Sequence, residues 1–120
     1  GQRDEALVLL SKVREIRTRA RDRFGLIRVL EAHAELLARG NENEAALVDL
    51  THAHACAHAF SLARHAPRLA EKCRTAQLAI AHLREGEQRA LVEKGEREHD
   101  RLEQDWSITP MKNKARDTLH

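Results

Sequence analysis

The sequence is poor in the residues that build compact mixed domains. Aromatic residues make up 2% of the 120 positions, and there are only five glycines and two prolines. The aromatic residues are Phe24, Phe60 and Trp106. With so few aromatic side chains and 33% charged residues, the composition is typical of a protein made of long helices.

Other absences exclude whole classes of function. The sequence has no apolar run long enough to span a bilayer. Nucleotide-binding glycine loops, nucleophile elbows and metalloprotease helices are also missing, so we expect neither an enzyme nor a cofactor. Cys56 and Cys73 fall on one predicted helix, roughly 25 Å apart, which is too far for a disulfide. Reduced thiols fit a cytoplasmic protein best.

Apolar residues recur at alternating spacings of three and four along two segments of the chain. The spacing is that of a coiled-coil seam, in which one narrow apolar stripe faces a partner helix. In the first segment only Arg23 interrupts it. The first stripe comprises Ala6, Leu9, Val13, Ile16, Ala20, Ile27, Leu30, Ala34 and Leu37. The second comprises Ala45, Val48, His52, Ala55, Ala59, Leu62, Ala66, Leu69, Cys73, Ala76, Ile80 and Leu83.

The predicted fold class is all-α, an antiparallel two-helix coiled-coil hairpin spanning residues 1–106. Helix 1 covers about 3–38, the turn 39–43 contains Gly40, and the longer helix 2 covers about 44–105. We expect Pro67 to kink helix 2. Residues 107–120 have no apolar pattern and are predicted to form a flexible tail.

Helix 2 carries apolar residues that the hairpin itself does not explain. Between Ala45 and Ala66 they lie on the outer side as well as on the seam, so a second copy or another protein is expected to cover them. Beyond Ile80, helix 2 outreaches helix 1 and is expected to need a partner. The predicted partner-binding residues are Leu50, Ala57, Phe60, Leu91, Leu102 and Trp106.

Histidine is common, with eight residues, and three of them share one face of helix 2. His54, His58 and His65 are candidate ligands for zinc or copper. No fourth ligand stands nearby on that face, so we interpret these histidines as structural and predict no metal. Metal binding and a pH-sensitive contact remain alternatives.

A stripe of arginines marks the first helix. Arg14, Arg17, Arg21 and Arg28 are predicted to share one face, which suits an acidic protein surface or phosphate groups. The net charge is only +2 and no aromatic residues interleave with the arginines, so nucleic acid is not the expected partner.

The segment Leu10-Ser11-Lys12-Val13-Arg14-Glu15-Ile16-Arg17-Thr18-Arg19-Ala20 is similar to the N-terminal run of the FliJ/YscO-type stalk proteins of type III secretion systems. The stretch from Arg89 to Trp106 resembles the end of that family's second helix. The resemblance implies a non-enzymatic coiled coil that links the export ATPase to the export gate and escorts chaperones. It also implies a cytoplasmic location, peripheral to an inner-membrane secretion complex.

Two alternatives stay open beside the stalk hypothesis. One is a general coiled-coil adaptor or assembly protein that dimerises through helix 2 and is a homo-oligomer in isolation. The other is a small histidine-rich helical protein that binds metal. The stalk hypothesis names the export ATPase, the export gate or a chaperone as partners, without membrane insertion.

Overall fold

The protein is all-helical along its described residues, in a computed structural model that describes residues 1–58 and 60–119, with side chains for all of these except 60–61 and 108–119. Five α-helices are joined by short connections, with one 3₁₀ segment between the third and the fourth. They are α1 (Gln2–Arg19), α2 (Arg23–Arg39), α3 (Asn43–Ala57), η1 (Phe60–His65), α4 (Ala66–Ala79) and α5 (Glu85–Leu119). The all-α prediction is confirmed, but the described residues form five α-helices rather than two.

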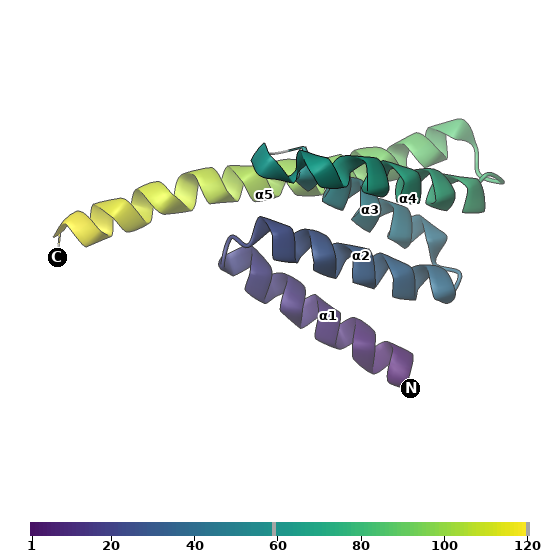
Figure 1. Ribbon diagram of the computed structural model, residues 1–120, viewed down its shortest axis with the longest axis horizontal. Helices are drawn as coiled ribbons and strands as arrows, with labels where there is room; N and C mark the ends of the chain where they lie inside the picture. Colours follow the sequence, from purple (N-terminus) through teal and green to yellow (C-terminus); the bar gives the residue numbers. More distant parts are fainter. Residues whose placement is uncertain (59, 120) are drawn as a thin grey trace.

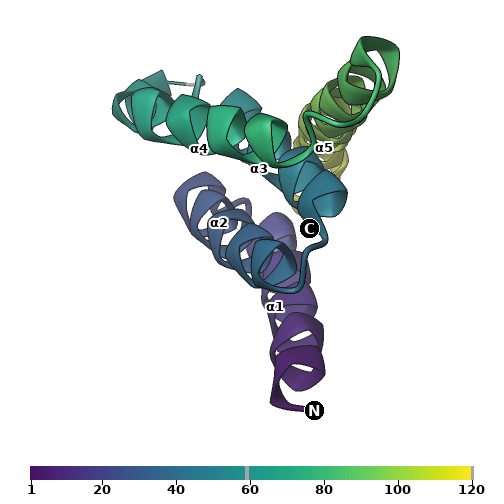
Figure 2. The same ribbon diagram turned by 90° about the vertical axis from the view of Figure 1, so that its right-hand side faces the viewer.

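The helices are arranged around α3. Helices α2, α4 and α5 all pack against α3, while α1 packs mainly on α2 at the edge of the molecule (Figures 1 and 2). The molecule measures 57 × 33 × 25 Å, and the end of α5 extends beyond the other helices (Figure 1). This is a small helical bundle with one projecting helix, not a two-helix rod.

The first predicted helix is interrupted beside Arg23, where the apolar spacing fails. Arg21 takes a left-handed conformation with φ of 56°, and Asp22 then caps α2 by accepting a hydrogen bond from the Gly25 backbone N–H at 2.8 Å. A side-chain cap of this kind satisfies one of the free N–H groups at a helix start. The chain therefore reverses between α1 and α2, where the sequence predicts a continuous helix.

The second connection lies where the sequence also places a turn, between Arg39 and Asn43. Asn41, with φ of 61°, takes the left-handed conformation there, while Gly40 keeps φ at −94°. The Glu42 backbone N–H donates to the Leu37 carbonyl at 2.8 Å and closes the end of α2. Asparagine tolerates left-handed geometry better than most residues, so this position suits it.

Pro67 begins a new helix instead of kinking a long one. It lies in the first turn of α4, after α3 has ended at Ala57 and the chain has passed through η1. The first backbone N–H groups of a helix have no partner inside the helix, so proline costs little at this position. The predicted helix 2 is therefore divided here, and divided again between Ala79 and Glu85.

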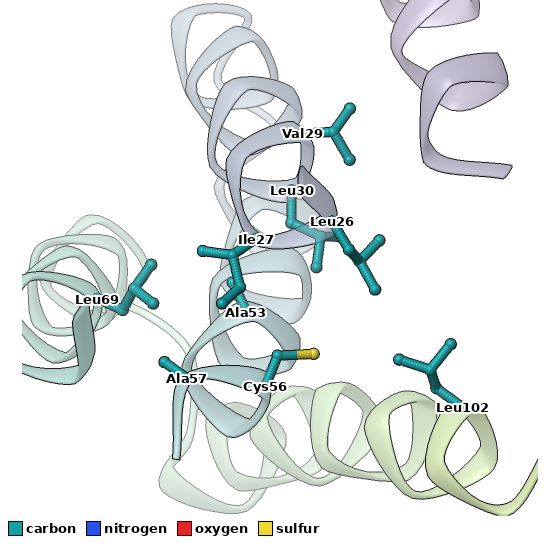
Figure 3. Close-up of a cluster of buried hydrophobic side chains, with 9 residues drawn as sticks. All are labelled: Leu26, Ile27, Val29, Leu30, Ala53, Cys56, Ala57, Leu69 and Leu102. Atoms are coloured by element: carbon teal, nitrogen blue, oxygen red, sulfur yellow. The ribbon is translucent and has the colours of Figure 1, made fainter. Parts of the chain in front are cut away.

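The core consists of two apolar clusters on opposite ends of α3, and it explains why α3 is apolar on nearly every side. One cluster contains Leu26, Ile27, Val29, Leu30, Ala53, Cys56, Ala57, Leu69 and Leu102 (Figure 3). The other contains Ala34, Leu37, Ala46, Leu47, Leu50, Ala76 and Ile80. Leu50 and Ala57, expected to face another chain, are thus buried by α2, α4 and α5 of the same chain. The side chain of Phe60 is outside the described part.

Helix α5 has an intramolecular partner, contrary to the expectation for the chain beyond Ile80. Leu102 is buried, and Leu91 and Trp106 pack against the two clusters. The backbone of α5 continues through Pro110 to Leu119, over residues that the sequence predicts to be a flexible tail from 107. Within the described residues no helix combines the length and apolarity that a membrane crossing needs.

Candidate functional site

The outward face of α1 carries large apolar side chains that nothing in the described chain covers. Val8, Leu9 and Ile16 are 56%, 61% and 60% exposed. No residue of α1 is fully buried. Leu9 and Ile16 are seven positions apart and therefore lie on the same side of the helix. We call Val8, Leu9 and Ile16 the α1 face.

A shallow groove of about 390 Å³ lies between α2 and α4, with α3 as its floor. Its lining is mainly apolar and made of small side chains, with carboxylates at the edge. The lining includes Ala34, Ala38, Ala46, Leu50, Ala76 and Ala79. Small residues on neighbouring helices would let another helix approach closely.

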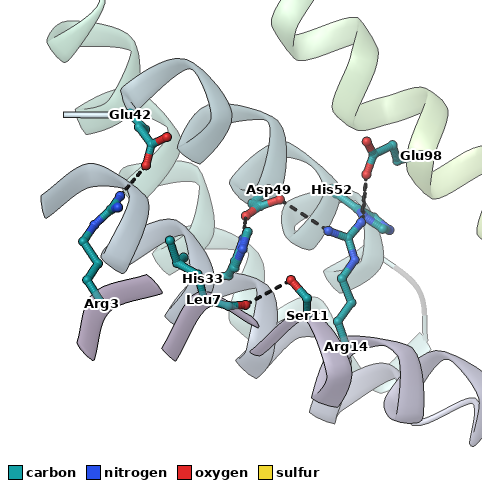
Figure 4. A network of polar contacts seen from close by, with 9 residues as sticks. All are labelled: Arg3, Leu7, Ser11, Arg14, His33, Glu42, Asp49, His52 and Glu98. Atoms are coloured by element: carbon teal, nitrogen blue, oxygen red, sulfur yellow. Dashed lines mark hydrogen bonds and ion pairs between the residues drawn. The ribbon is translucent and has the colours of Figure 1, made fainter. Parts of the chain in front are cut away.

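A partly buried polar network joins α1, α2, α3 and α5 (Figure 4). Arg14 of α1 donates to Glu98 of α5 at 2.8 Å and lies 3.6 Å from the Asp49 carboxylate of α3. His33 Nδ1 of α2 is 2.5 Å from Asp49 Oδ2. Burial raises the pKa of Asp49, although the hydrogen bond from His33 and the charge of Arg14 act in the opposite direction. Arg14 thus has structural partners inside the chain.

Beside this network, three potential metal ligands converge. The ligand atoms of His52, Cys56 and His99 all lie within 4.8 Å of one another, and Cys56 Sγ is 3.4 Å from His99 Nδ1. His52 and Cys56 are four residues apart on α3, one helical turn, and His99 comes from α5. This is the one such three-residue group within the described residues.

Burial controls the protonation of the three side chains. Burial, and then the Arg14 and His99 charges, lower the pKa of His52 to about 3. Burial also lowers the pKa of His99 and raises the pKa of the Cys56 thiol to about 12. Both imidazoles are therefore neutral near pH 7, the form that binds metals, and the thiol is protonated.

The histidines singled out in the sequence lie elsewhere. The rings of His54 and His58 meet edge to face with centroids 4.5 Å apart, near the end of α3. His65 instead packs against the Phe24 ring, with centroids 5.3 Å apart. The sequence analysis did not identify His99 as a candidate ligand, because it compared histidines by their spacing along one helix. His99 is distant in the sequence, and only the packing of α5 on α3 brings it to Cys56.

The predicted arginine stripe is divided by the break between α1 and α2. Arg17 pairs with Asp22 at 3.2 Å, and Arg21 donates to the Trp106 carbonyl at 3.2 Å. The Arg28 guanidinium lies 5.8 Å from the Phe24 ring centre. With Arg14 held in the network above, the four arginines bind different partners rather than form one surface.

Trp106 has a structural contact that the sequence did not indicate. Its Nε1–H donates to the Thr18 carbonyl at 3.0 Å, and the Arg23 guanidinium lies 4.9 Å from its ring centre. Arg23 of α2 also pairs with Glu103, which lies on α5 like Trp106. These contacts fasten α5 to the turn between α1 and α2.

A charged clamp between α2 and α4 predicts an acid-sensitive part of the stability. Arg68 Nη2 and Lys72 Nζ of α4 lie 2.6 and 2.7 Å from the Glu31 carboxylate of α2. Burial raises the pKa of Glu31, but the hydrogen bonds and charges of Arg68 and Lys72 outweigh it and lower the pKa overall. A lowered carboxyl pKa contributes stability above the unfolded pKa, and this contribution is lost as the pH falls through the folded pKa.

Replacing Glu31 with glutamine should therefore destabilise the protein at pH 7 and flatten the fall in stability below the ordinary glutamate pKa of about 4.5. Urea melts of both proteins from pH 7 down to pH 3 would measure this. Glu35→Gln is a matched control, because Glu35 forms only an exposed pair with Arg39 one turn along its own helix. Equal pH profiles for wild type and Glu31→Gln would contradict the clamp.

Comparison with known protein families, curated proteins and solved structures finds nothing that matches this chain.

Proposed function

We propose that this protein is a non-enzymatic, all-helical assembly module that associates with a second copy of itself through the α1 face. The observation that supports this is the exposure of Val8, Leu9 and Ile16 on a peripheral helix. Leaving such side chains in water forfeits roughly 25 cal/mol for each Å² of apolar surface. Burying these side chains against another molecule would therefore contribute favourable free energy to association.

The charges of α1 favour an antiparallel pair of these helices. The first turn carries Asp4 and Glu5, and the last turn carries Arg17 and Arg19. In an antiparallel pair the acidic start of one helix lies against the basic end of the other, at both ends of the contact. Such a contact is self-complementary, as a twofold dimer requires.

Light scattering over a range of protein concentrations tests this proposal. We expect the wild-type mass to rise from 13.7 kDa toward twice that value, and the double variant Leu9→Lys/Ile16→Lys to stay monomeric. Leu78→Lys is the matched control, because Leu78 is 77% exposed but lies on α4, away from the α1 face. A monomeric wild type, or a double variant that still dimerises, would contradict the proposal.

The narrower role as a type III secretion stalk has less support from this geometry. The resemblance implies one antiparallel pair of long helices, whereas the described residues form five α-helices, of which α2, α4 and α5 pack around α3. The projecting end of α5 is the feature that most favours a stalk-like contact (Figure 1). A pull-down with a purified export ATPase, comparing the full chain with a chain ending at Ser107, would test that role.

A further inference from the structure

We propose that His52, Cys56 and His99 bind one Zn²⁺ ion, with His52 Nε2, Cys56 Sγ and His99 Nδ1 as the three protein ligands. The site would connect α3 to α5 and does not depend on the proposed association through α1.

The separations of the three groups are close to those of a metal site. With Zn–N near 2.0 Å and Zn–S near 2.3 Å, neighbouring ligand atoms of a tetrahedral ion lie about 3.5 Å apart. Cys56 Sγ and His99 Nδ1 are already 3.4 Å apart, and one ligand atom from each of the three residues lies within 4.8 Å of the others. Side-chain rotations that move the ligand atoms by about 1 Å would bring all three to the distances of a tetrahedral site.

A buried nitrogen without a partner points independently to a ligand here. His52 is 3% exposed, and its Nε2 atom is the one buried side-chain polar atom among the described residues that has no hydrogen-bond partner. A buried polar atom left unsatisfied costs about 1–3 kcal/mol, so native proteins rarely keep one. A metal ion bound at Nε2 would satisfy it.

The other nitrogen of each imidazole faces a carboxylate. His52 Nδ1 is 3.8 Å from Glu98 Oε2, and His99 Nε2 is 3.8 Å from Glu103 Oε1. In metal sites, a carboxylate that accepts the second ring N–H fixes the ring orientation and strengthens the ligand. Glu103 is within a short movement of His99 Nε2, whereas His52 Nδ1 must turn from the nearer Arg14 guanidinium, at 3.5 Å, toward Glu98.

Burial, and then the Arg14 charge, lower the pKa of His52, so this charge disfavours a cation there, but the two nearest guanidinium groups are each paired with a carboxylate. Arg14 Nη2 lies 3.5 Å from His52 Nδ1, but Arg14 is itself paired with Glu98 and close to Asp49. Arg23 is paired with Glu103. On binding, the Cys56 thiol gives its proton to solvent and the resulting thiolate binds the ion, which offsets one of its two positive charges. Imidazole and thiolate together suit Zn²⁺.

Titration of the metal-free full chain with Co²⁺, a spectroscopic substitute for Zn²⁺, tests the site. We expect one Co²⁺ per chain, a thiolate-to-metal charge-transfer band in the near ultraviolet, and displacement of Co²⁺ by Zn²⁺. Loss of an outer carboxylate typically weakens a metal site about 10–100-fold, so loss of a ligand should cost at least 100-fold. We expect this loss for both Cys56→Ser and His99→Gln.

Two variants serve as matched controls. Cys73→Ser removes the other free thiol, and His54→Gln breaks the contact between the His54 and His58 rings. Both should keep the band and the affinity. His99→Gln decides the result even if Cys56→Ser fails to fold, because His99 is only partly buried.

The absence of a charge-transfer band in folded wild type would overturn the proposal. So would a band that persists in His99→Gln, or Co²⁺ binding that disappears in His54→Gln, since the latter would place the ion on the surface histidines.

Discussion

Replacing Leu30 with alanine should lower the free energy of unfolding by about 2–5 kcal/mol, the usual cost of a cavity left by a large buried side chain. Leu30 is fully buried on α2, in the cluster that also receives residues from α3, α4 and α5 (Figure 3). The cavity would therefore weaken packing among four helices, α2, α3, α4 and α5. Stability of a small domain is only about 5–15 kcal/mol, so this change removes a large share of it.

Urea or thermal unfolding followed by circular dichroism would measure the effect. Leu78→Ala is the control, because Leu78 is 77% exposed and its truncation should change stability by less than about 0.5 kcal/mol. Similar losses for the two variants would show that Leu30 does not occupy the core described here.

The helical content could be predicted from the sequence because it depends on local pattern. The three-and-four spacing of apolar residues identifies helix over nearly the whole chain. The predicted turn at Gly40 also falls where α2 ends and α3 begins. Its signal is strong because several turn-forming residues stand together between two apolar stripes.

The number of helices could not be predicted as well, because two of the breaks depend on single side chains. At the first break, Arg21 takes a left-handed conformation and Asp22 caps α2. In the apolar spacing, the one sign of this break is the charged residue Arg23. At the last, no glycine, proline or asparagine stands between Ile80 and Glu85. There the Gln88 side chain donates to the carbonyls of Ile80 and Leu83, at 3.3 and 3.0 Å.

The prediction that another chain covers the outer apolar residues of helix 2 was wrong for a different reason. In a continuous hairpin, residues such as Leu50 on the outer side of helix 2 need another molecule to cover them. Once the chain breaks near Pro67, α4 folds back on α3 and buries the same residues inside the chain. An apolar surface predicts that something covers it, but the sequence alone does not distinguish another chain from a later part of the same one.

The candidate metal site illustrates the same limit. His52 and Cys56 could be paired by their four-residue spacing, which places them on one side of α3. His99 could not, because it is 43 residues from Cys56 and its position depends on how α5 crosses α3. Gly95 stands where the two helices cross, and a Cβ atom at that position would lie too close to α3.

Replacing Gly95 with alanine should destabilise the protein by about 1–3 kcal/mol, although alanine normally favours a helix by about 1 kcal/mol over glycine. Gly95 is buried where α5 crosses α3. A Cβ atom there would lie 2.6 Å from the Val48 carbonyl oxygen and 2.7 Å from Thr51 Cβ. The Val48 oxygen is a backbone atom, so the steric clash can be relieved only if one helix moves away from the other.

Gly86→Ala is the matched control for this variant. Gly86 lies in the first turn of the same helix, and a Cβ atom there meets nothing within 4 Å in the described chain. Its replacement should leave stability unchanged or raise it by a few tenths of a kcal/mol. Opposite signs for the two glycines, measured by urea unfolding, would establish that the α3–α5 contact depends on the missing side chain at Gly95.

The Gly95 variant also links the fold to the candidate metal site. His99 follows Gly95 by four residues and lies on the same side of α5, so moving that helix away from α3 should draw His99 from His52 and Cys56. We therefore expect Gly95→Ala to weaken Co²⁺ binding while Gly86→Ala leaves it unchanged. A Gly95 variant more stable than wild type would contradict the close crossing of the two helices, on which the three-residue site depends.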